Sequence, residues 1–348
     1  MSTSSLRVLT FLALLLCRVS ALAAADAARC SAPEGTQPFE FTSGENRLSG
    51  FIDFPRGQGP YPAVLIIHGS GGTDVFNGSN DYNGHYVSLR NEFRSVGVAT
   101  VVWDKPGSGC SQGGYSNGNP ITERATETVA ALRALKGRSG IDASRMGLWG
   151  ISQGGWVAPM AAVRTADVKF LIVVSAPARD AVSQLEYQAL TLLKNNGVPD
   201  AELKIAGSHL RRAFAIMRAG GPVEEFSAAV EPLQRYPALR ELGITVGTPD
   251  DYRAWQSSVD YQYRPDTALR ELQQPVLAIF GNQDVLIDWN ESARIYSETF
   301  RASGNQDTTI KIFRNATHEL KSPGSESYAK DYLSTMRAWL QKHTKVNR

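Results

Sequence analysis

The pattern Gly-x-Ser-x-Gly, which can present a nucleophilic serine on a sharp turn, recurs in this 348-residue chain. Two of its matches centre on Ser111 and on Ser152. Such a nucleophile needs a buried strand before it and a helix after it, with glycines where side chains would collide with the backbone. Residues 145–149 have the pattern of a strand and residues 155–162 that of a helix, whereas Ser111 precedes a glycine-rich loop. We therefore assign the nucleophile to Ser152.

A serine hydroxyl becomes a good nucleophile when a base, usually an imidazole, takes its proton. Among the five histidines, His318 lies in a loop after a predicted strand over residues 309–313, where a sheet edge can present it to Ser152. The other four fit less well. His68 lies in a loop with a different expected role, His85 and His209 are expected on helix surfaces, and His343 is expected in the last turn of the final helix. The base is therefore expected to be His318.

The acid that orients this imidazole is expected between Ser152 and His318 in the chain, at the end of another strand. Two aspartates, Asp284 and Asp288, follow the apolar run at residues 276–280. Asp288 begins the sequence Asp-Trp-Asn-Glu, a capping box that starts a helix, and therefore has a structural explanation. We assign the catalytic acid to Asp284 and keep Asp288 as the second choice.

A serine hydrolase stabilises its oxyanion with backbone N–H donors that are already in place. One donor is expected at Gln153, directly after the nucleophile, and the other in the glycine-rich loop 68–72 that follows the first buried strand. Within that loop we select Ser70 and Gly71. Trp156, near the nucleophile, is the expected substrate contact. This chemistry needs no cofactor, and the cysteines lack the spacing of a metal site.

The elements that must hold these residues follow from the hydrophobic pattern. An antiparallel hairpin is expected over residues 39–54. Continuous apolar runs then mark strands buried on both faces of a mostly parallel sheet, at 63–67, 98–103, 146–149, 170–174 and 276–280. Helical stretches between them, at 85–95, 122–135 and 154–163, give the alternation of a doubly wound α/β fold. A helix at 291–300, a strand at 309–313 and a final helix at 328–343 complete the pattern.

The alternation stops after Pro177 and resumes near Pro275. The residues between are helical by pattern and break at 196–197, 220–222 and 247–249. We interpret 178–270 as a helical cap inserted into a core made of 26–177 and 271–348. Most aromatic side chains of this cap are expected to hold it together, and others to line a substrate pocket.

Residues 1–25 have the layout of a secretory signal peptide, with Arg7, an apolar run and the small-residue triplet 21–23. The run is too short to span a membrane. Removing the signal leaves equal numbers of basic and acidic residues, so no nucleic-acid partner is indicated. It also leaves Cys30 and Cys110, which are equally compatible with a disulfide and with two free thiols. The expected location is outside the cytoplasm, in a bacterial periplasm, because a glycan at the sequon of Asn315 would crowd His318.

Taken together, the motifs resemble the α/β-hydrolase superfamily, specifically esterases related to its dienelactone-hydrolase and prolyl-oligopeptidase branches. The motifs are residues 68–72, 103–109, 150–156 and 281–284 with His318. The resemblance implies an eight-stranded sheet, a Ser152/Asp284/His318 triad and acyl transfer on esters. It departs at Pro106, where related chains often carry arginine, and the cap is not matched.

The leading functional prediction is a secreted serine carboxylesterase that acts on a small-molecule ester through a covalent acyl-enzyme. Two alternatives within the same chemistry are a peptidase or amidase of the prolyl-oligopeptidase type and an acyl-thioester hydrolase. The peptidases usually carry a large propeller, for which the roughly fifteen residues between signal and first strand leave no room. A non-catalytic binding protein of this fold would be expected to lack one of the three catalytic residues, and all three are present.

Overall fold

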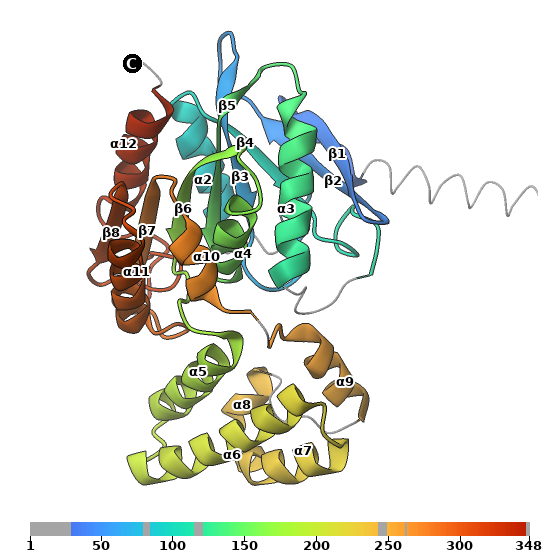
Figure 1. Cartoon of the computed structure of the whole chain (residues 1–348), viewed down its shortest axis with the longest axis vertical. Helices are drawn as coiled ribbons and strands as arrows, with labels where there is room; N and C mark the ends of the chain where they lie inside the picture. The colour runs from blue at the N-terminus through green and yellow to red at the C-terminus, as the bar shows by residue number, and fades with distance from the viewer. Residues whose placement is uncertain (1–28, 79–83, 115–120, 243–248, 262, 346–348) are drawn as a thin grey trace, which may run out of the picture.

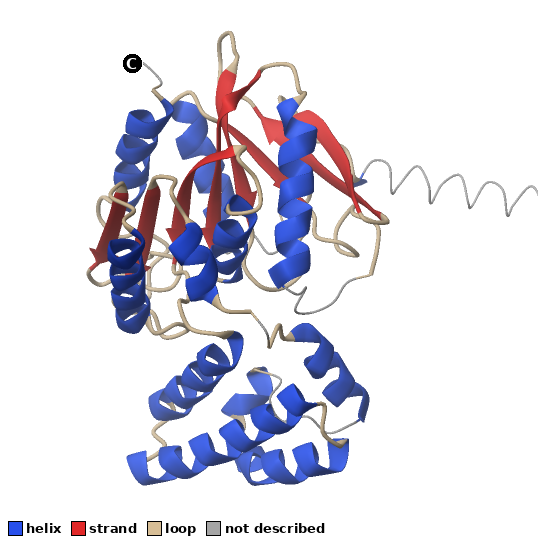
Figure 2. Cartoon of the chain, in the orientation of Figure 1, coloured by secondary structure: helices blue, strands red, loops and turns tan. Residues whose placement is uncertain are grey.

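The computed structural model describes residues 29–78, 84–114, 121–242, 249–261 and 263–345. Figure 1 shows a sheet flanked by helices and, below it, a second group of helices. The described residues of this second group are drawn in helix and loop colours (Figure 2). The chain thus has an α/β layer structure that carries an additional helical unit.

The sheet has eight strands in the order β1-β2-β4-β3-β5-β6-β7-β8. Strands β1 and β2 form the antiparallel hairpin, β2 pairs antiparallel with β4, and the remaining neighbours pair in parallel. The α/β class and the mostly parallel eight-stranded sheet are confirmed. The strands are β1 Gln37–Ser43, β2 Asn46–Asp53, β3 Tyr61–Ile67, β4 Ala99–Trp103, β5 Ile141–Ile151, β6 Val168–Val174, β7 Val276–Gly281 and β8 Thr308–Phe313.

Helices cover both faces of the sheet and bury its apolar side chains. One hydrophobic cluster joins the sheet to α3, α4, α10 and α11. A second cluster joins the opposite face to α2 and α12. The bounds of these helices are α2 His85–Ser95, α3 Ile121–Lys136, α4 Gln153–Ala162, α10 Pro265–Glu271, α11 Trp289–Ser303 and α12 Tyr332–Thr344.

The second group of helices lies between β6 and α10 in the chain and has a hydrophobic cluster of its own, which includes Leu210, Phe214 and Phe226. Its breaks at Asn196 and Gly220 follow the ends of two helices, as glycine- and asparagine-rich breaks should. The expected break at 247–248 lies outside the described residues. The elements are α5 Ala181–Asn195, α6 Asp200–Ala219, α7 Val223–Val230, the 3₁₀ helix η1 Glu231–Arg235, α8 Ala238–Glu241 and α9 Pro249–Ser258.

Helix α10 lies within the segment 178–270 that the sequence pattern groups with the cap. In the structure, Leu269 of α10 and the preceding Tyr263 belong to the hydrophobic cluster between the sheet and helices α3, α4 and α11. The helical period alone does not reveal which neighbour covers an apolar face, so the pattern could not distinguish a core helix from a cap helix here.

Candidate active site

Ser152 occupies the sharp turn between β5 and α4. Its backbone has φ 54° and ψ −121°, a combination that an L-residue adopts only under strain. The turn is fixed on both sides: the Ser152 N–H donates to the carbonyl of Val174 at 3.0 Å, and the Ser152 carbonyl accepts from Gly155 N–H at 2.8 Å. Backbone strain held in place at one serine is typical of a nucleophile on such a turn.

The glycines around Ser152 are required by close backbone approaches. A Cβ at Gly150 would lie 2.3 Å from the carbonyl oxygen of Gly154, and one at Gly155 would lie 2.3 Å from the Cβ of Ala176. A Cβ at Gly154 would lie 2.1 Å from the carbonyl oxygen of Ile67, at the end of β3. The first turn of α4 is therefore packed directly against the beginning of the loop that follows β3.

The imidazole of His318 and the carboxylate of Asp284 form a hydrogen bond, with 2.7 Å between Nδ1 and Oδ2. Both groups are buried, with 6% and 4% of their surface exposed. The second carboxylate oxygen of Asp284 accepts the backbone N–H groups of Leu286 at 2.8 Å and Ile287 at 3.1 Å. The carboxylate is therefore held in one orientation, which in turn holds the imidazole.

The environment of His318 tunes its basicity. Burial by itself lowers the pKa of an imidazole, but the charge and the hydrogen bond of Asp284 outweigh burial, with a further contribution from the charge of Glu319. The pKa of His318 is therefore raised above the ordinary value of 6.5. An imidazole paired with a carboxylate in this way can accept a proton from a hydroxyl group and stabilise the resulting charge.

The end of β6 links the segments that carry Ser152 and His318. Val174, its last residue, accepts the N–H of Ser152, and the next residue, Ser175, donates its hydroxyl to the carbonyl of His318 at 2.7 Å. The loop after β8 also lies close to β7, because a Cβ at Gly281 would meet the carbonyl oxygens of Ala316 and Thr317 at 2.4 Å. The three residues predicted as a triad thus follow β5, β7 and β8 at the carboxyl edge of the sheet.

Sequence reasoning did not select Ser175. It is fully buried, its N–H donates to the carbonyl of Ile279 at 2.8 Å, and its φ of 46° is positive. The available signal was its place immediately after a buried strand at the same edge as Ser152. The hydroxyl of Ser175 holds the backbone of His318 in place.

Asp288 has the structural role expected for it. Its Oδ1 accepts the N–H of Glu291 at 3.1 Å and caps α11. Its other oxygen pairs with Arg179 at 3.1 Å. The structure therefore brings Asp284, and not Asp288, to the imidazole of His318.

Trp156 lies on α4 one turn after the nucleophile. Its side chain is 8% exposed and packs edge-on against Tyr263, with 5.9 Å between the ring centroids. The hydroxyl of Tyr263 donates to the backbone carbonyl of Trp156 at 3.0 Å. These contacts give Trp156 a packing role, and its contact with substrate stays a prediction.

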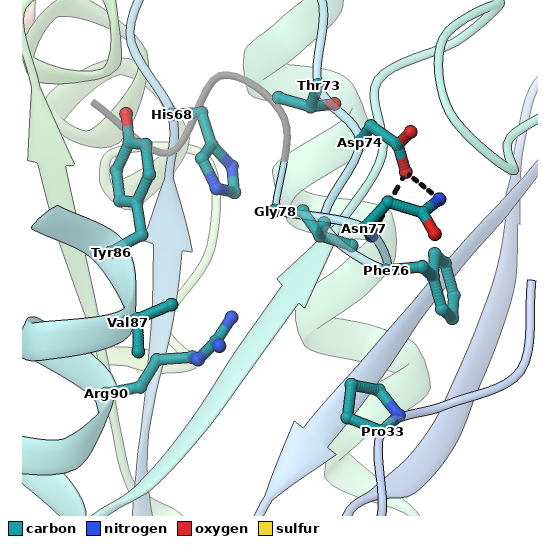
Figure 3. Close-up of a pocket in the computed structure, with 11 residues that line it drawn as sticks. Pro33, His68, Thr73, Asp74, Phe76, Asn77, Gly78, Tyr86, Val87 and Arg90 are labelled. Atoms are coloured by element: carbon teal, nitrogen blue, oxygen red, sulfur yellow. Dashed lines mark hydrogen bonds between the residues drawn. The ribbon is translucent and has the colours of Figure 1, made fainter. Parts of the chain in front are cut away.

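His68 begins the glycine-rich loop and borders a cavity of about 230 Å³ that is also lined by Thr73, Asp74, Tyr86 and Arg90 (Figure 3). Its ring meets Tyr86 edge-on, with 4.2 Å between centroids. Burial, followed by the positive charges of Lys105, Arg124 and Arg90, lowers the pKa of His68 well below 6.5. The pKa of His68 is thus shifted in the opposite direction from that of the carboxylate-paired His318.

The expectation that His85 is a surface residue is wrong. The side chain is 1% exposed and lies among aromatic rings, with Nε2 3.3 Å from the hydroxyl of Tyr332. Burial is the main reason that the pKa of His85 is lowered to about 3. The helix was correctly placed, but its buried face also carries a polar ring, which the apolar pattern could not reveal.

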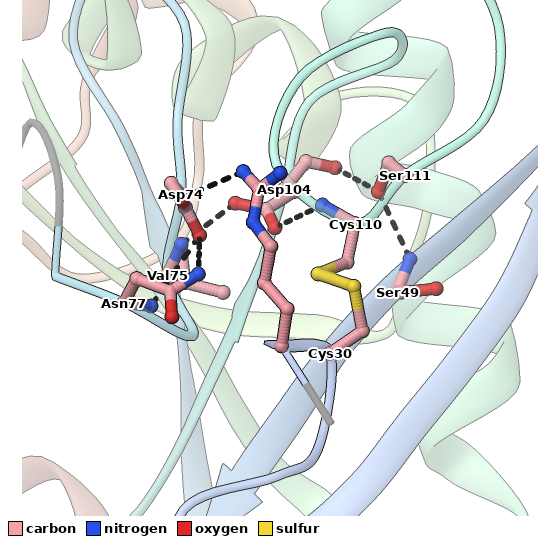
Figure 4. The surroundings of a disulfide bond; sticks show 9 residues. Cys30, Ser49, Asp74, Val75, Asn77, Asp104, Cys110 and Ser111 are labelled. Carbon is pink, nitrogen blue, oxygen red and sulfur yellow. Dashed lines mark hydrogen bonds and ion pairs between the residues drawn. A yellow bond between two sulfur atoms is a disulfide. The ribbon is translucent and has the colours of Figure 1, made fainter. Parts of the chain in front are cut away.

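Ser111, the centre of another Gly-x-Ser-x-Gly match, is part of a hydrogen-bonded loop (Figure 4). Its hydroxyl donates to the carbonyl of Asp104 at 2.6 Å and accepts the N–H of Ser49 at 2.9 Å. The neighbouring Cys110 forms a disulfide with Cys30. This loop is therefore fixed to β2 and to the N-terminal segment, and Ser111 is used in its architecture.

Within the described ranges, no group of three or more His, Cys, Asp or Glu side chains is placed to hold a metal ion. None of the helices in the described part of the chain combines the length and the apolar character needed to cross a membrane.

Comparison with known proteins places the chain in a family. A family model described as serine aminopeptidase, S33, matches residues 74–322. Esterase EstD from Thermotoga maritima is 24% identical over 294 residues, which are 83% of this chain and 61% of EstD. The chain thus spans about three fifths of the length of that relative.

Solved structures share the fold at low sequence identity. The esterase Pf2001 from Pyrococcus furiosus has a TM-score of 0.58 and 15% identity, covering 89% of this chain and 91% of the esterase. The complex of DcsB with its substrate analogue has a TM-score of 0.57 and 18% identity, covering 89% and 99%. With the layered sheet and the family match, these likenesses show that the chain is an α/β hydrolase and belongs to the serine aminopeptidase S33 family.

Proposed function

We propose that this α/β hydrolase is a serine carboxylesterase whose catalytic residues are Ser152, His318 and Asp284. The observation that carries the proposal is the buried 2.7 Å hydrogen bond between His318 and Asp284 at the sheet edge where Ser152 occupies its strained turn. A nucleophile on a turn and an imidazole oriented by a carboxylate are the components of acyl transfer. The esterases EstD and Pf2001 support the same reaction class.

In this reaction the Ser152 Oγ attacks the ester carbonyl carbon while its proton passes to Nε2 of His318. Backbone N–H groups of Gln153 and of the loop 68–72 stabilise the oxyanion of the tetrahedral intermediate. The C–O bond to the alcohol then breaks, and His318 returns its proton to the leaving oxygen. Water attacks the acyl-enzyme by the same route, releasing the acid and restoring Ser152.

The experiment uses p-nitrophenyl esters of rising chain length together with two serine variants. Ser152→Ala should abolish turnover, with a loss of about 10⁴- to 10⁶-fold in kcat. Ser111→Ala is the matched control, because within the described residues this hydroxyl is hydrogen-bonded to the backbone of Asp104 and of Ser49 in β2. After treatment with an organophosphate, mass spectrometry should find the adduct on Ser152. An adduct on Ser111, or none on an active enzyme, would refute the assignment.

Amide hydrolysis is the second candidate function, because the matching family model is described as a serine aminopeptidase. The same nucleophile, base and acid can cleave an amide if the leaving amine is protonated. Aminoacyl p-nitroanilides assayed beside p-nitrophenyl esters separate the two candidates. A kcat/KM that is higher for the anilides would favour the aminopeptidase.

We also propose that the protein is exported, with residues 1–25 as the signal peptide and a periplasmic location. The disulfide between Cys30 and Cys110 supports this proposal, because such bonds persist mainly in oxidising compartments. Fractionation of the native host, with N-terminal sequencing of the mature protein, tests it. A cytoplasmic protein that retains residues 1–25 would contradict it.

A further inference from the structure

Lys105 is a buried lysine that the mechanism so far does not use. It follows β4 by two residues, and 1% of its surface is exposed. Its Nζ donates hydrogen bonds to two backbone carbonyls, those of Gly69 at 2.5 Å and Gly71 at 2.7 Å. Its own N–H donates to the hydroxyl of Thr73 at 2.8 Å. Lys105 thus contacts three residues of the loop after β3.

Burying an ammonium group is costly unless strong acceptors receive its protons. Among the described residues, no carboxylate oxygen lies within ion-pair distance of this Nζ. Nearby Glu127 is already bound by Arg124 at 2.7 Å and by the indole N–H of Trp103. Burial, followed by the charge of Arg124, lowers the pKa of Lys105 well below 10.5. The two loop carbonyls are therefore its direct hydrogen-bond acceptors. The contact is kept although burying the ammonium group costs free energy.

The two bonds determine the direction of two peptide groups. In a planar trans peptide, the carbonyl of one residue and the N–H of the next point in opposite directions. Because Lys105 holds the carbonyls of Gly69 and Gly71, the N–H groups of Ser70 and Gly72 point away from the lysine. Gly71, between these peptides, has a φ of +88°, which a residue with a side chain would rarely adopt.

The loop begins beside the nucleophile. A Cβ at Gly154 would meet the carbonyl oxygens of Ile67 and His68 at 2.1 Å and 3.1 Å, so the start of α4 touches the base of the loop. Gln153, whose N–H is the expected first oxyanion donor, precedes Gly154. The orientation of the loop peptides therefore decides which second donor the oxyanion meets.

We propose that Lys105 is a positioning residue of the oxyanion hole, which holds the loop from behind so that the N–H groups of Ser70 and Gly72 face the reacting carbonyl. The inference rests on the proposed acyl-transfer function. It replaces the N–H of Gly71 by that of Gly72 as an expected oxyanion donor. It also assigns a positioning role to the Asp-Lys-Pro-Gly segment after β4. Lys105 itself does not touch the substrate.

The first test compares Lys105→Met with the wild type. Methionine keeps much of the apolar stem and removes the donors. Because an oxyanion donor acts mainly in the transition state, kcat should fall about 10²- to 10³-fold while KM changes little. Affinity for a boronic acid, which forms a tetrahedral anion on Ser152, should fall in parallel. Lys169→Met is the matched control, because Lys169 also donates to a backbone carbonyl, that of Ala166, at an exposed site.

The second test uses the wild type and does not depend on a variant folding. In a crystal structure of its boronic acid adduct, the oxyanion oxygen should accept N–H groups from Gln153 and from Ser70 or Gly72. A donor at Gly71 would overturn the inference. So would a folded Lys105→Met enzyme with unchanged kcat and boronate affinity. A wild type without ester or amide turnover and without a Ser152 adduct would instead refute the proposed function itself.

Discussion

Asp284 and Asp288 lie four residues apart and contact different partners, so their loss should have different consequences. Asp284→Asn should lower kcat by about 10⁴-fold, because the imidazole would lose the acceptor that sets its tautomer. Asp288→Ala should leave chemistry largely intact and cost about 0.5 to 2 kcal/mol of unfolding free energy through the lost helix cap. Steady-state kinetics and thermal unfolding of both variants check this. Exchanged phenotypes would transfer the acid role to Asp288.

The raised pKa of His318 predicts a pH dependence. The base must be neutral to accept the Ser152 proton, so kcat/KM should rise with pH through a midpoint above 6.5. In Asp284→Asn the charge that raises this pKa is gone while burial, which lowers it, persists. The midpoint should therefore move to lower pH. A pH profile of both enzymes measures the shift. An unmoved midpoint would mean that a group other than His318 controls the rise of kcat/KM with pH.

At the level of residues, the sequence allowed the partners in the Asp284–His318 hydrogen bond to be named, because chain order and strand context leave few positions at the sheet edge. It could not reveal Ser175 or Lys105. Their importance comes from long-range backbone contacts, a serine hydroxyl to the carbonyl of His318 and an ammonium to a loop 34 to 36 residues away. Neither contact leaves a periodic signal in the chain.

At the level of elements, the crossing of α4 over the end of β3 requires a glycine at position 154. Gly154→Ala should place a methyl group 2.1 Å from the carbonyl oxygen of Ile67 and so displace the nucleophile turn. We expect a loss of about 1 to 3 kcal/mol in unfolding free energy, together with lower kcat. Gly137→Ala is the control, because a Cβ there would have no neighbour within 4 Å. Denaturant unfolding and kinetics of both variants test this, and equal effects would argue against the crowded turn.

The strands and helices of the core were largely predictable because each is a buried apolar run or an amphipathic stretch between turn residues. The predicted helix at 85–95 coincides with α2, and the predicted strands overlap those observed. Two features were not predictable. The pattern did not show that α10 packs under the sheet, and it did not show that His85 faces the core. Both depend on which surface covers a helix.

At the scale of the whole molecule, we expect the helices α5 to α9 to set substrate choice. They have their own hydrophobic cluster. Helix α5 also contacts the loop that carries Asp284, because its Gln184 side chain donates to the carbonyl of Leu286 at 2.5 Å. Val285 and Leu286 expose apolar surface beside Asp284. Replacing residues 181–258 with a short linker, while keeping α10, should preserve hydrolysis of acetate esters and reduce the preference among bulkier acyl groups.

The measurement is the ratio of kcat/KM values for a long and a short p-nitrophenyl ester in the full and shortened chains. Circular dichroism confirms that the shortened chain is folded. A folded variant with an unchanged ratio would place specificity in the core. A folded but inactive variant would show that the cap supplies part of the chemistry.

The two connections of the cap to the core lie beside each other. One groove is lined by both connections, namely residues 178–180, which lead from the core into the cap, and residues 264–266, which lead from the cap back to the core. An insertion whose ends meet in this way leaves the strand order and register of its host undisturbed. In evolutionary terms, we therefore expect that helices α5 to α9 can be exchanged, lengthened or shortened while the sheet and its predicted catalytic edge stay unchanged. Caps of related hydrolases should then diverge in length and sequence faster than strands β5, β7 and β8, which precede Ser152, Asp284 and His318.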